Sequence, residues 1–68
     1  MNYYVNIYNA SGLLVSDYGS FESLSLAKRY VQETLSEREY RGHQAEVFCQ
    51  HKPHDVSMGV FYSTQEAV

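Results

Sequence analysis

Residues 23–41 have the sequence SLSLAKRYVQETLSEREYR, and the spacing of the apolar side chains in this stretch decides the fold. The side chains that recur at intervals of three and four are Leu24, Ala27, Val31 and Leu35. This period places them on one face of a helix. Ser23 is a favourable N-cap, and Gly42 can adopt the left-handed conformation that ends a helix. The pattern predicts an amphipathic helix over about residues 23–41.

Charges on this segment indicate a solvated outer helix face. The cations here are four of the five in the chain, Lys28, Arg29, Arg38 and Arg41, and they alternate with Glu33, Glu37 and Glu39. Arg29–Glu33 and Glu37–Arg41 have the i,i+4 spacing of helical ion pairs. Because the net charge is -3 and the cations are interleaved with acids, no surface carries the row of positive charge that binds phosphates. We therefore expect no direct binding to nucleic acid.

Before the helix, residues 3–8 (YYVNIY) alternate with a period of two, as a β-strand does. Residues 9–12 (NASG) are turn formers, and residues 13–18 (LLVSDY) resume an extended pattern. These three segments predict a hairpin over about residues 3–18.

After the helix, residues 44–50 alternate again, residues 52–55 (KPHD) indicate a turn, and residues 56–63 form a partner strand. We expect a second hairpin over about residues 44–63 and a short tail over 64–68. The whole predicts a single α+β domain over residues 1–68, with ββαββ order and a four-stranded antiparallel sheet that carries one helix on one face.

Composition limits the class of protein. A chain of 68 residues with 44% hydrophobic residues is long enough for one small core. The chain has one cysteine, so it forms no internal disulfide, and it lacks an apolar run of about 18 residues. These features predict a cytoplasmic protein that does not associate with membranes.

One helix covers only one face of such a sheet, and the other face is expected to be polar. We expect the aliphatic side to pack under the helix, with Val5, Ile7, Val15, Val47, Cys49 and Val60. The uncovered side is then unusually apolar, with Tyr4, Tyr8, Leu14, Tyr18, Phe48 and Phe61. Apolar surface of this kind marks an interface.

We therefore predict a partner-binding patch made of five aromatic residues, Tyr4, Tyr8, Tyr18, Phe48 and Phe61. Arg38 and Arg41 are expected to add contacts at the rim that steer association. The alternative is that cross-strand aromatic pairs only stabilise the sheet. Stacking of RNA bases on the rings is not expected, because no Lys/Arg-rich frame surrounds them.

Chemistry-bearing residues gather near the second turn, where Cys49, His51 and His54 are candidate metal ligands. Their spacing is not that of the usual structural zinc sites, and a buried cysteine with solvated histidines explains them equally well. Catalysis by Cys49 would need a concave pocket, which a sheet with one helix hardly offers. We predict that the protein is not an enzyme and uses no cofactor.

The small size, mild acidity, ββαββ order, lone cysteine and tyrosine-rich sheet together resemble the short inhibitors encoded by phages and mobile elements, anti-CRISPR proteins among them. The resemblance is one of type, covers the whole chain and rests on no diagnostic motif, so no residue role carries over. It implies a protein that binds a host nucleoprotein complex in the host cytoplasm. The second hypothesis is a homodimeric structural or regulatory protein whose aromatic faces pack on each other.

Overall fold

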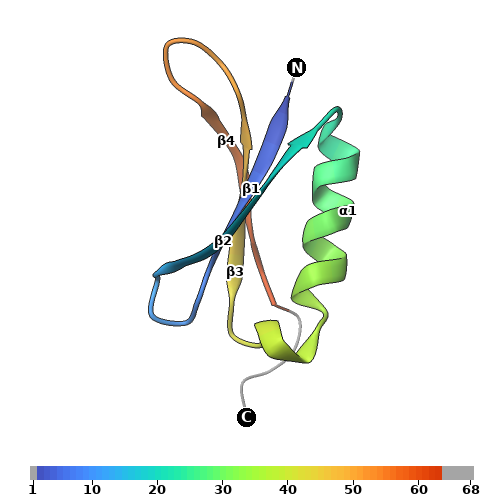
Figure 1. Cartoon of the computed structure of the whole chain (residues 1–68), viewed down its shortest axis with the longest axis vertical. Coiled ribbons are helices and arrows are strands. Elements are labelled where there is room, and N and C mark those ends of the chain that lie inside the picture. The colour runs from blue at the N-terminus through green and yellow to red at the C-terminus, as the bar shows by residue number, and fades with distance from the viewer. Residues whose placement is uncertain (1, 64–68) are drawn as a thin grey trace.

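The computed structural model describes residues 2–63, which form an antiparallel sheet with one helix on a single face (Figure 1). The elements in chain order are β1 (Tyr3–Tyr8), β2 (Leu14–Phe21), α1 (Leu24–Leu35), a 3-10 turn η1 (Arg38–Tyr40), β3 (Gln44–Cys49) and β4 (Val56–Tyr62). The strand order across the sheet is β2-β1-β3-β4, and every neighbouring pair is antiparallel. The predicted α+β class and four-stranded sheet are confirmed, and the predicted tail over 64–68 lies outside the described residues.

Helix α1 begins where the sequence predicts and ends earlier. The Ser23 hydroxyl accepts a hydrogen bond from the Leu26 N–H at 3.2 Å, which is a standard N-cap. At the other end the Ser36 hydroxyl donates to the Glu33 carbonyl at 2.7 Å, and Glu37 is extended with ψ 144°. The predicted end at residue 41 is therefore wrong, because the apolar period stops at Leu35. The ion pair Arg29–Glu33 forms at 3.6 Å, whereas Glu37 lies outside any helix.

The core lies between α1 and the two central strands. Its buried residues are Val5, Ile7, Ala27, Val31, Leu35, Ala45 and Val47. These are the residues that the two periods, 3.6 in the helix and 2 in the strands, place toward each other. Cys49 is also buried on the helix side, as its strand position predicts.

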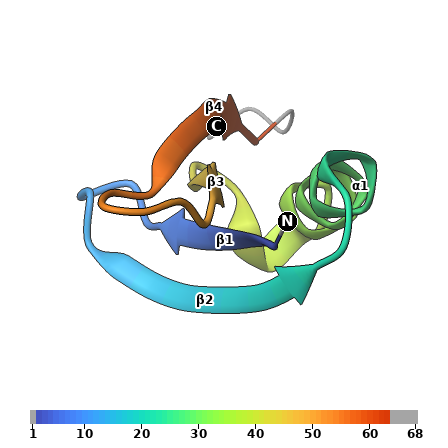
Figure 2. The same ribbon diagram turned by 90° about the horizontal axis from the view of Figure 1, so that it is seen from above.

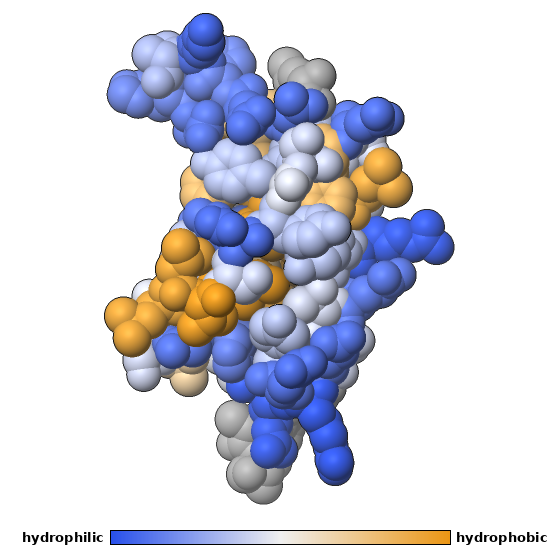
Figure 3. Space-filling model, in the orientation of Figure 1, coloured by the Kyte–Doolittle hydropathy of each residue, from blue (hydrophilic) through white to orange (hydrophobic). Residues whose placement is uncertain are grey.

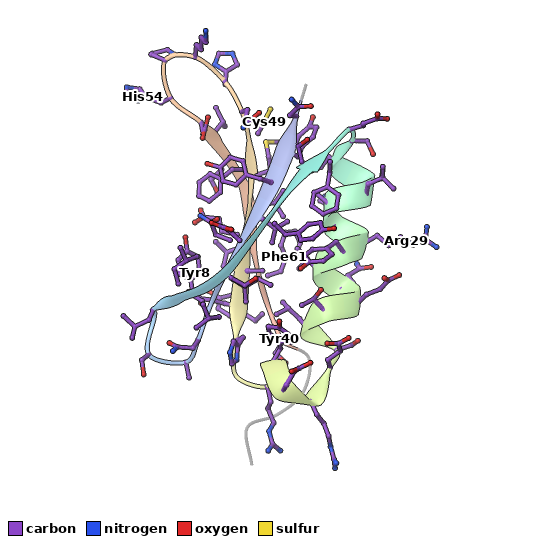
Figure 4. The ribbon with its side chains drawn as sticks, viewed as in Figure 1. Tyr8, Arg29, Tyr40, Cys49, His54 and Phe61 are labelled. Atoms are coloured by element: carbon purple, nitrogen blue, oxygen red, sulfur yellow. The ribbon has the colours of Figure 1, made fainter. Side chains whose placement is uncertain are left out.

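Two of the five aromatic residues predicted to form the binding patch, Tyr18 and Phe61, lie on the other face of the sheet. Tyr18 pairs with Val5 and therefore lies on the helix side, where its ring stacks on Tyr30 of α1 at 4.8 Å. Phe61 pairs with Ala45 and packs against the core. Figure 4 shows Phe61 on the α1 side of the sheet and Tyr8 on the opposite side.

Strand irregularities explain part of this difference. The register shift between Ile7 and Tyr8 leaves Val15 without a direct partner, so Leu14 and Tyr18 fall on opposite faces although their spacing is even. Val15 is therefore not a core residue, and it is half exposed. In β4 the positions are inverted relative to the prediction, because Val60 pairs with Glu46 on the uncovered face. At position 61 the phenylalanine ring occupies the space beside the small side chain of Ala45 and reaches the core. A valine side chain is too short to fill this space.

Within residues 2–63 the α-helix has 12 residues, which is too short to cross a bilayer.

Candidate interaction surface

The sheet surface that α1 leaves uncovered, called the open face here, consists of three rows of side chains. The rows, from β2 to β4, are Leu14–Tyr8–Gln44–Tyr62, then Asp17–Asn6–Glu46–Val60, and then Gly19–Tyr4–Phe48–Ser57. The outer rows are mainly apolar and aromatic, and the middle row is mainly polar and acidic. Three of the predicted binding residues, Tyr4, Tyr8 and Phe48, lie together on this face.

A stacked ring pair marks one end of the open face. The Tyr4 and Phe48 rings lie with their centroids 5.2 Å apart and their planes at 16°. Gly19 on β2 makes room for this pair, since a Cβ there would lie 2.7 Å from the Cβ of Tyr4. The pair thus presents a rigid flat edge beside the neighbouring carboxylates.

The Tyr4 hydroxyl also ties the loop between β3 and β4 to the sheet. It donates to Asp55 Oδ2 at 2.6 Å, and Asp55 Oδ1 accepts from the His51 N–H at 3.3 Å. The hydrogen bond to Asp55 raises the pKa of the Tyr4 phenol to about 12, with burial and the Asp55 charge adding to the rise. The same hydrogen bond, then that from His51, lowers the pKa of Asp55.

We expect Asp55→Asn to bring the pKa of Tyr4 back toward its ordinary value of 10.0, because the charged acceptor is lost. The signal to follow is the tyrosine Cζ shift in a pH titration by NMR. Since the folded pKa of Tyr4 is raised, the stabilisation from this bond is complete below pH 10.0 and is lost as the pH passes about 12. The folded pKa of Asp55 is lowered, so the stabilisation that Asp55 contributes is present above pH 3.8 and is lost as the pH falls below that value. Asp17→Asn is the control, and a similar shift of Tyr4 in that variant would contradict the assignment to Asp55.

The open face is acidic. Asp17 is exposed, Glu46 accepts a hydrogen bond from the Ser57 hydroxyl at 2.6 Å, and Asp55 lies beside Tyr4. Within the four described strands no residue is Lys or Arg. Figure 3 shows this face edge-on, with a hydrophobic patch over the β1–β2 hairpin end, where Leu13, Leu14 and Val15 are about half exposed or more. The face therefore combines apolar surface with unneutralised negative charge.

A shallow depression lies along the acidic part of this face. It has a volume of about 340 Å³ and is open to solvent. Its lining residues are Tyr4, Asn6, Asp17, Tyr18, Gly19, Gln50 and Asp55. Two carboxylates on an open wall suit a single cationic side chain better than an enclosed substrate.

The remaining predicted site residues lie elsewhere. Arg38 and Arg41 are exposed in and after η1, beyond the end of α1 and outside the three rows of the open face (Figure 1). Tyr18 and Phe61 are on the helix side, although the exposed part of Tyr18 lines the depression.

Among the metal candidates, Cys49 is buried under the helix side, whereas His51 and His54 are exposed in the loop between β3 and β4. Figure 4 places His54 in this loop, away from Cys49. No group of three or more His, Cys, Asp or Glu side chains within residues 2–63 could hold a metal ion.

Comparison of the chain with protein-family models, curated proteins and solved structures found no match. The residues of this candidate surface that the aromatic pattern missed are Asp17, Glu46 and Asp55. Glu46 could have been found from its alternation with Phe48 in the same strand. Asp17 reaches the open face through the register shift at Val15, and Asp55 through loop geometry, so neither could have been found from alternation.

Proposed function

We propose that this chain is a small non-catalytic protein-binding module whose open face binds a partner surface rich in arginine and apolar side chains. The observation that carries the proposal is the Tyr4–Phe48 ring pair, centroids 5.2 Å apart, beside Asp17, Glu46 and Asp55 with no strand cation. The guanidinium group of arginine stacks on aromatic rings and pairs with carboxylates, so it matches both halves of this surface. We expect one guanidinium group to enter the depression that Asp17 and Asp55 line.

The acidic character of the face favours an inhibitor of a nucleoprotein complex as the specific form of this function. Protein surfaces that hold nucleic acid are strongly cationic. A protein that covers such a surface with carboxylates and rings competes with the nucleic acid for it. This agrees with the resemblance to anti-CRISPR-type inhibitors, and it would place the protein in the cytoplasm of a host cell.

The alternative of a homodimer that packs through its aromatic faces has less support. Two sheets that pack face to face lie about 10 Å apart. Stacking two open faces would bring Asp17, Glu46 and Asp55 of both copies into one dry layer without a strand cation to pair them. Burial of unpaired carboxylates is costly, so a basic partner is favoured over a second copy on this face.

The experiment is affinity capture from bacterial lysate with the tagged chain, followed by mass spectrometry. The test variant is Tyr8→Thr with Phe48→Thr, which removes two open-face rings but keeps strand-forming residues and net charge. The control is Leu26→Thr, which removes an apolar side chain that is 46% exposed on α1. We expect one nucleic-acid-binding complex to be retained by the native chain and by the control, and lost by the test variant.

Circular dichroism of each variant separates loss of binding from loss of folding. Retention of the complex by a folded test variant would contradict the use of the open face. Recovery of a partner without a cationic surface would contradict the charge argument.

A further inference from the structure

Strand β4 forms an edge of the sheet that nothing in residues 2–63 covers. Helix α1 packs mainly on β1, β2 and β3, and Figure 2 shows β4 at the edge of the sheet opposite to β2. The strand sequence VSMGVFY has seven residues and no charge, and Val60 and Tyr62 are 44% and 68% exposed. Long, uncharged apolar edges pair readily with another strand.

In β4 the backbone N–H and C=O groups of alternate residues point away from β3, toward the free edge of the sheet. The Ser63 N–H donates to the His43 carbonyl at 3.0 Å, so residues 63 and 43 form a hydrogen-bonded pair. Hydrogen-bonded pairs alternate with non-hydrogen-bonded pairs along an antiparallel ladder. The backbone of Phe61 therefore also forms hydrogen bonds to β3, whereas the backbones of Val60 and Tyr62 do not. Val60 and Tyr62 therefore direct their N–H and C=O groups to the free edge.

The other edge of the sheet, β2, is less suited to pairing. It carries Asp17, and two register shifts, between Tyr3 and Tyr4 and between Ile7 and Tyr8, break its ladder with β1. The ladder of β4 with β3 has one shift, between Val47 and Phe48, which lies outside residues 60–62. Bulges and charges are the features by which proteins protect edge strands. With one open edge and one protected edge, pairing closes at two copies and does not continue into a filament.

We propose that two copies of this chain pair through β4 in antiparallel register about a two-fold axis at Phe61. Val60 of each copy then exchanges two backbone hydrogen bonds with Tyr62 of the other, because both residues direct their groups outward. On the helix side the two Phe61 rings meet at a close non-hydrogen-bonded position, and on the open face each Val60 lies beside a Tyr62 ring. Every cross-strand neighbour within residues 60–62 is apolar or aromatic, and no like charges meet.

Pairing through β4 keeps both helices on one side of a continuous eight-stranded sheet and both open faces on the other. The dimer would present two partner-binding surfaces side by side, which raises avidity for a repeated or extended target. This inference is independent of the proposed function, because the β4 edge pairs whether or not the open face binds a partner.

The test uses the native chain first. We expect sedimentation velocity to show a concentration-dependent shift from the 7.8 kDa monomer to twice that mass. In hydrogen exchange followed by NMR, the Val60 and Tyr62 amides should gain protection as the concentration rises, whereas the Phe61 and Ser63 amides should be protected throughout. A chain that stays monomeric into the millimolar range, or a dimer in which the Val60 and Tyr62 amides remain unprotected, would overturn the proposal.

The variant test compares Val60→Lys with Leu14→Lys. Both residues lie on the open face and are about equally exposed, at 44% and 52%, but only Val60 lies on the β4 edge. We expect Val60→Lys to weaken dimerisation by about tenfold or more and Leu14→Lys to leave it unchanged. The reverse order would place the interface on the open face or on β2 and would refute pairing through β4.

Discussion

Replacement of Ile7 by alanine is expected to leave a large part of the chain unfolded at 25 °C. The Ile7 side chain is 1% exposed and belongs to the buried cluster that α1 closes with Val31 and Leu35. Truncation of a buried isoleucine to alanine costs about 2–5 kcal/mol of unfolding free energy, because the cavity only partly collapses. A domain of this length has on the order of 3–10 kcal/mol in total. The loss is therefore comparable to the whole stability of the fold.

The measurement is urea denaturation followed by circular dichroism, with Val15→Ala as the matched control. Val15 is also β-branched and in a strand, but it is 49% exposed and lies at the register shift of β2. We expect its truncation to change the unfolding free energy by about 0.5 kcal/mol or less. Equal effects of the two substitutions would show that the core does not lie between β1 and α1.

The fold could be predicted because period and burial agree over most of the chain. Val5, Ile7, Val47 and Cys49 alternate with more exposed residues, and Ala27 and Val31 repeat at helical spacing. Each of these positions lies where its period places it. The predicted end of α1 is too late, because Glu37–Arg41 has the charge spacing of a helix but only one side chain, Tyr40, that packs against the core.

Side-chain orientation in the edge strands could not be predicted, because it depends on where the ladder is interrupted. The extra residue at Val15 leaves Leu14 on the open face and moves Tyr18 to the helix side. In β4, Phe61 faces the core and Val60 faces solvent, because the residue opposite Phe61 is small Ala45 and the helix does not extend over this edge. Neither fact is visible in a strand taken alone.

Because of these errors, the predicted and the observed candidate surfaces differ in chemical character. The predicted patch consists of five aromatic residues, Tyr18 and Phe61 among them, with Arg38 and Arg41 at its rim. The observed surface keeps Tyr4, Tyr8 and Phe48 and adds a row of carboxylates between the rings. Asp55 could not be assigned from its place in the KPHD turn, since only the bond from Tyr4 at 2.6 Å brings it to the sheet.

Reversal of charge on the open face is expected to lower the affinity for the partner recovered by capture by about 10- to 100-fold, mainly through slower association. The test variant is Asp17→Lys with Glu46→Lys, which replaces both acids of the middle row. Because the native face attracts a cationic surface, raising the salt concentration should slow association of the native chain. The same increase in salt concentration should slow association of the charge-reversed variant less, or accelerate it.

The matched control is Glu37→Lys with Glu39→Lys, which makes the same change in net charge on exposed residues beyond α1. If the total charge of the protein steered association, the control would lose as much affinity as the test variant. We expect the control to retain most of the native association rate, because these charges lie outside the three rows of the open face and salt screens charges over about 8 Å at physiological ionic strength. Association rates from surface plasmon resonance at several salt concentrations distinguish the two cases. An open-face variant that binds as fast as the native chain would show that the rings act without the carboxylates.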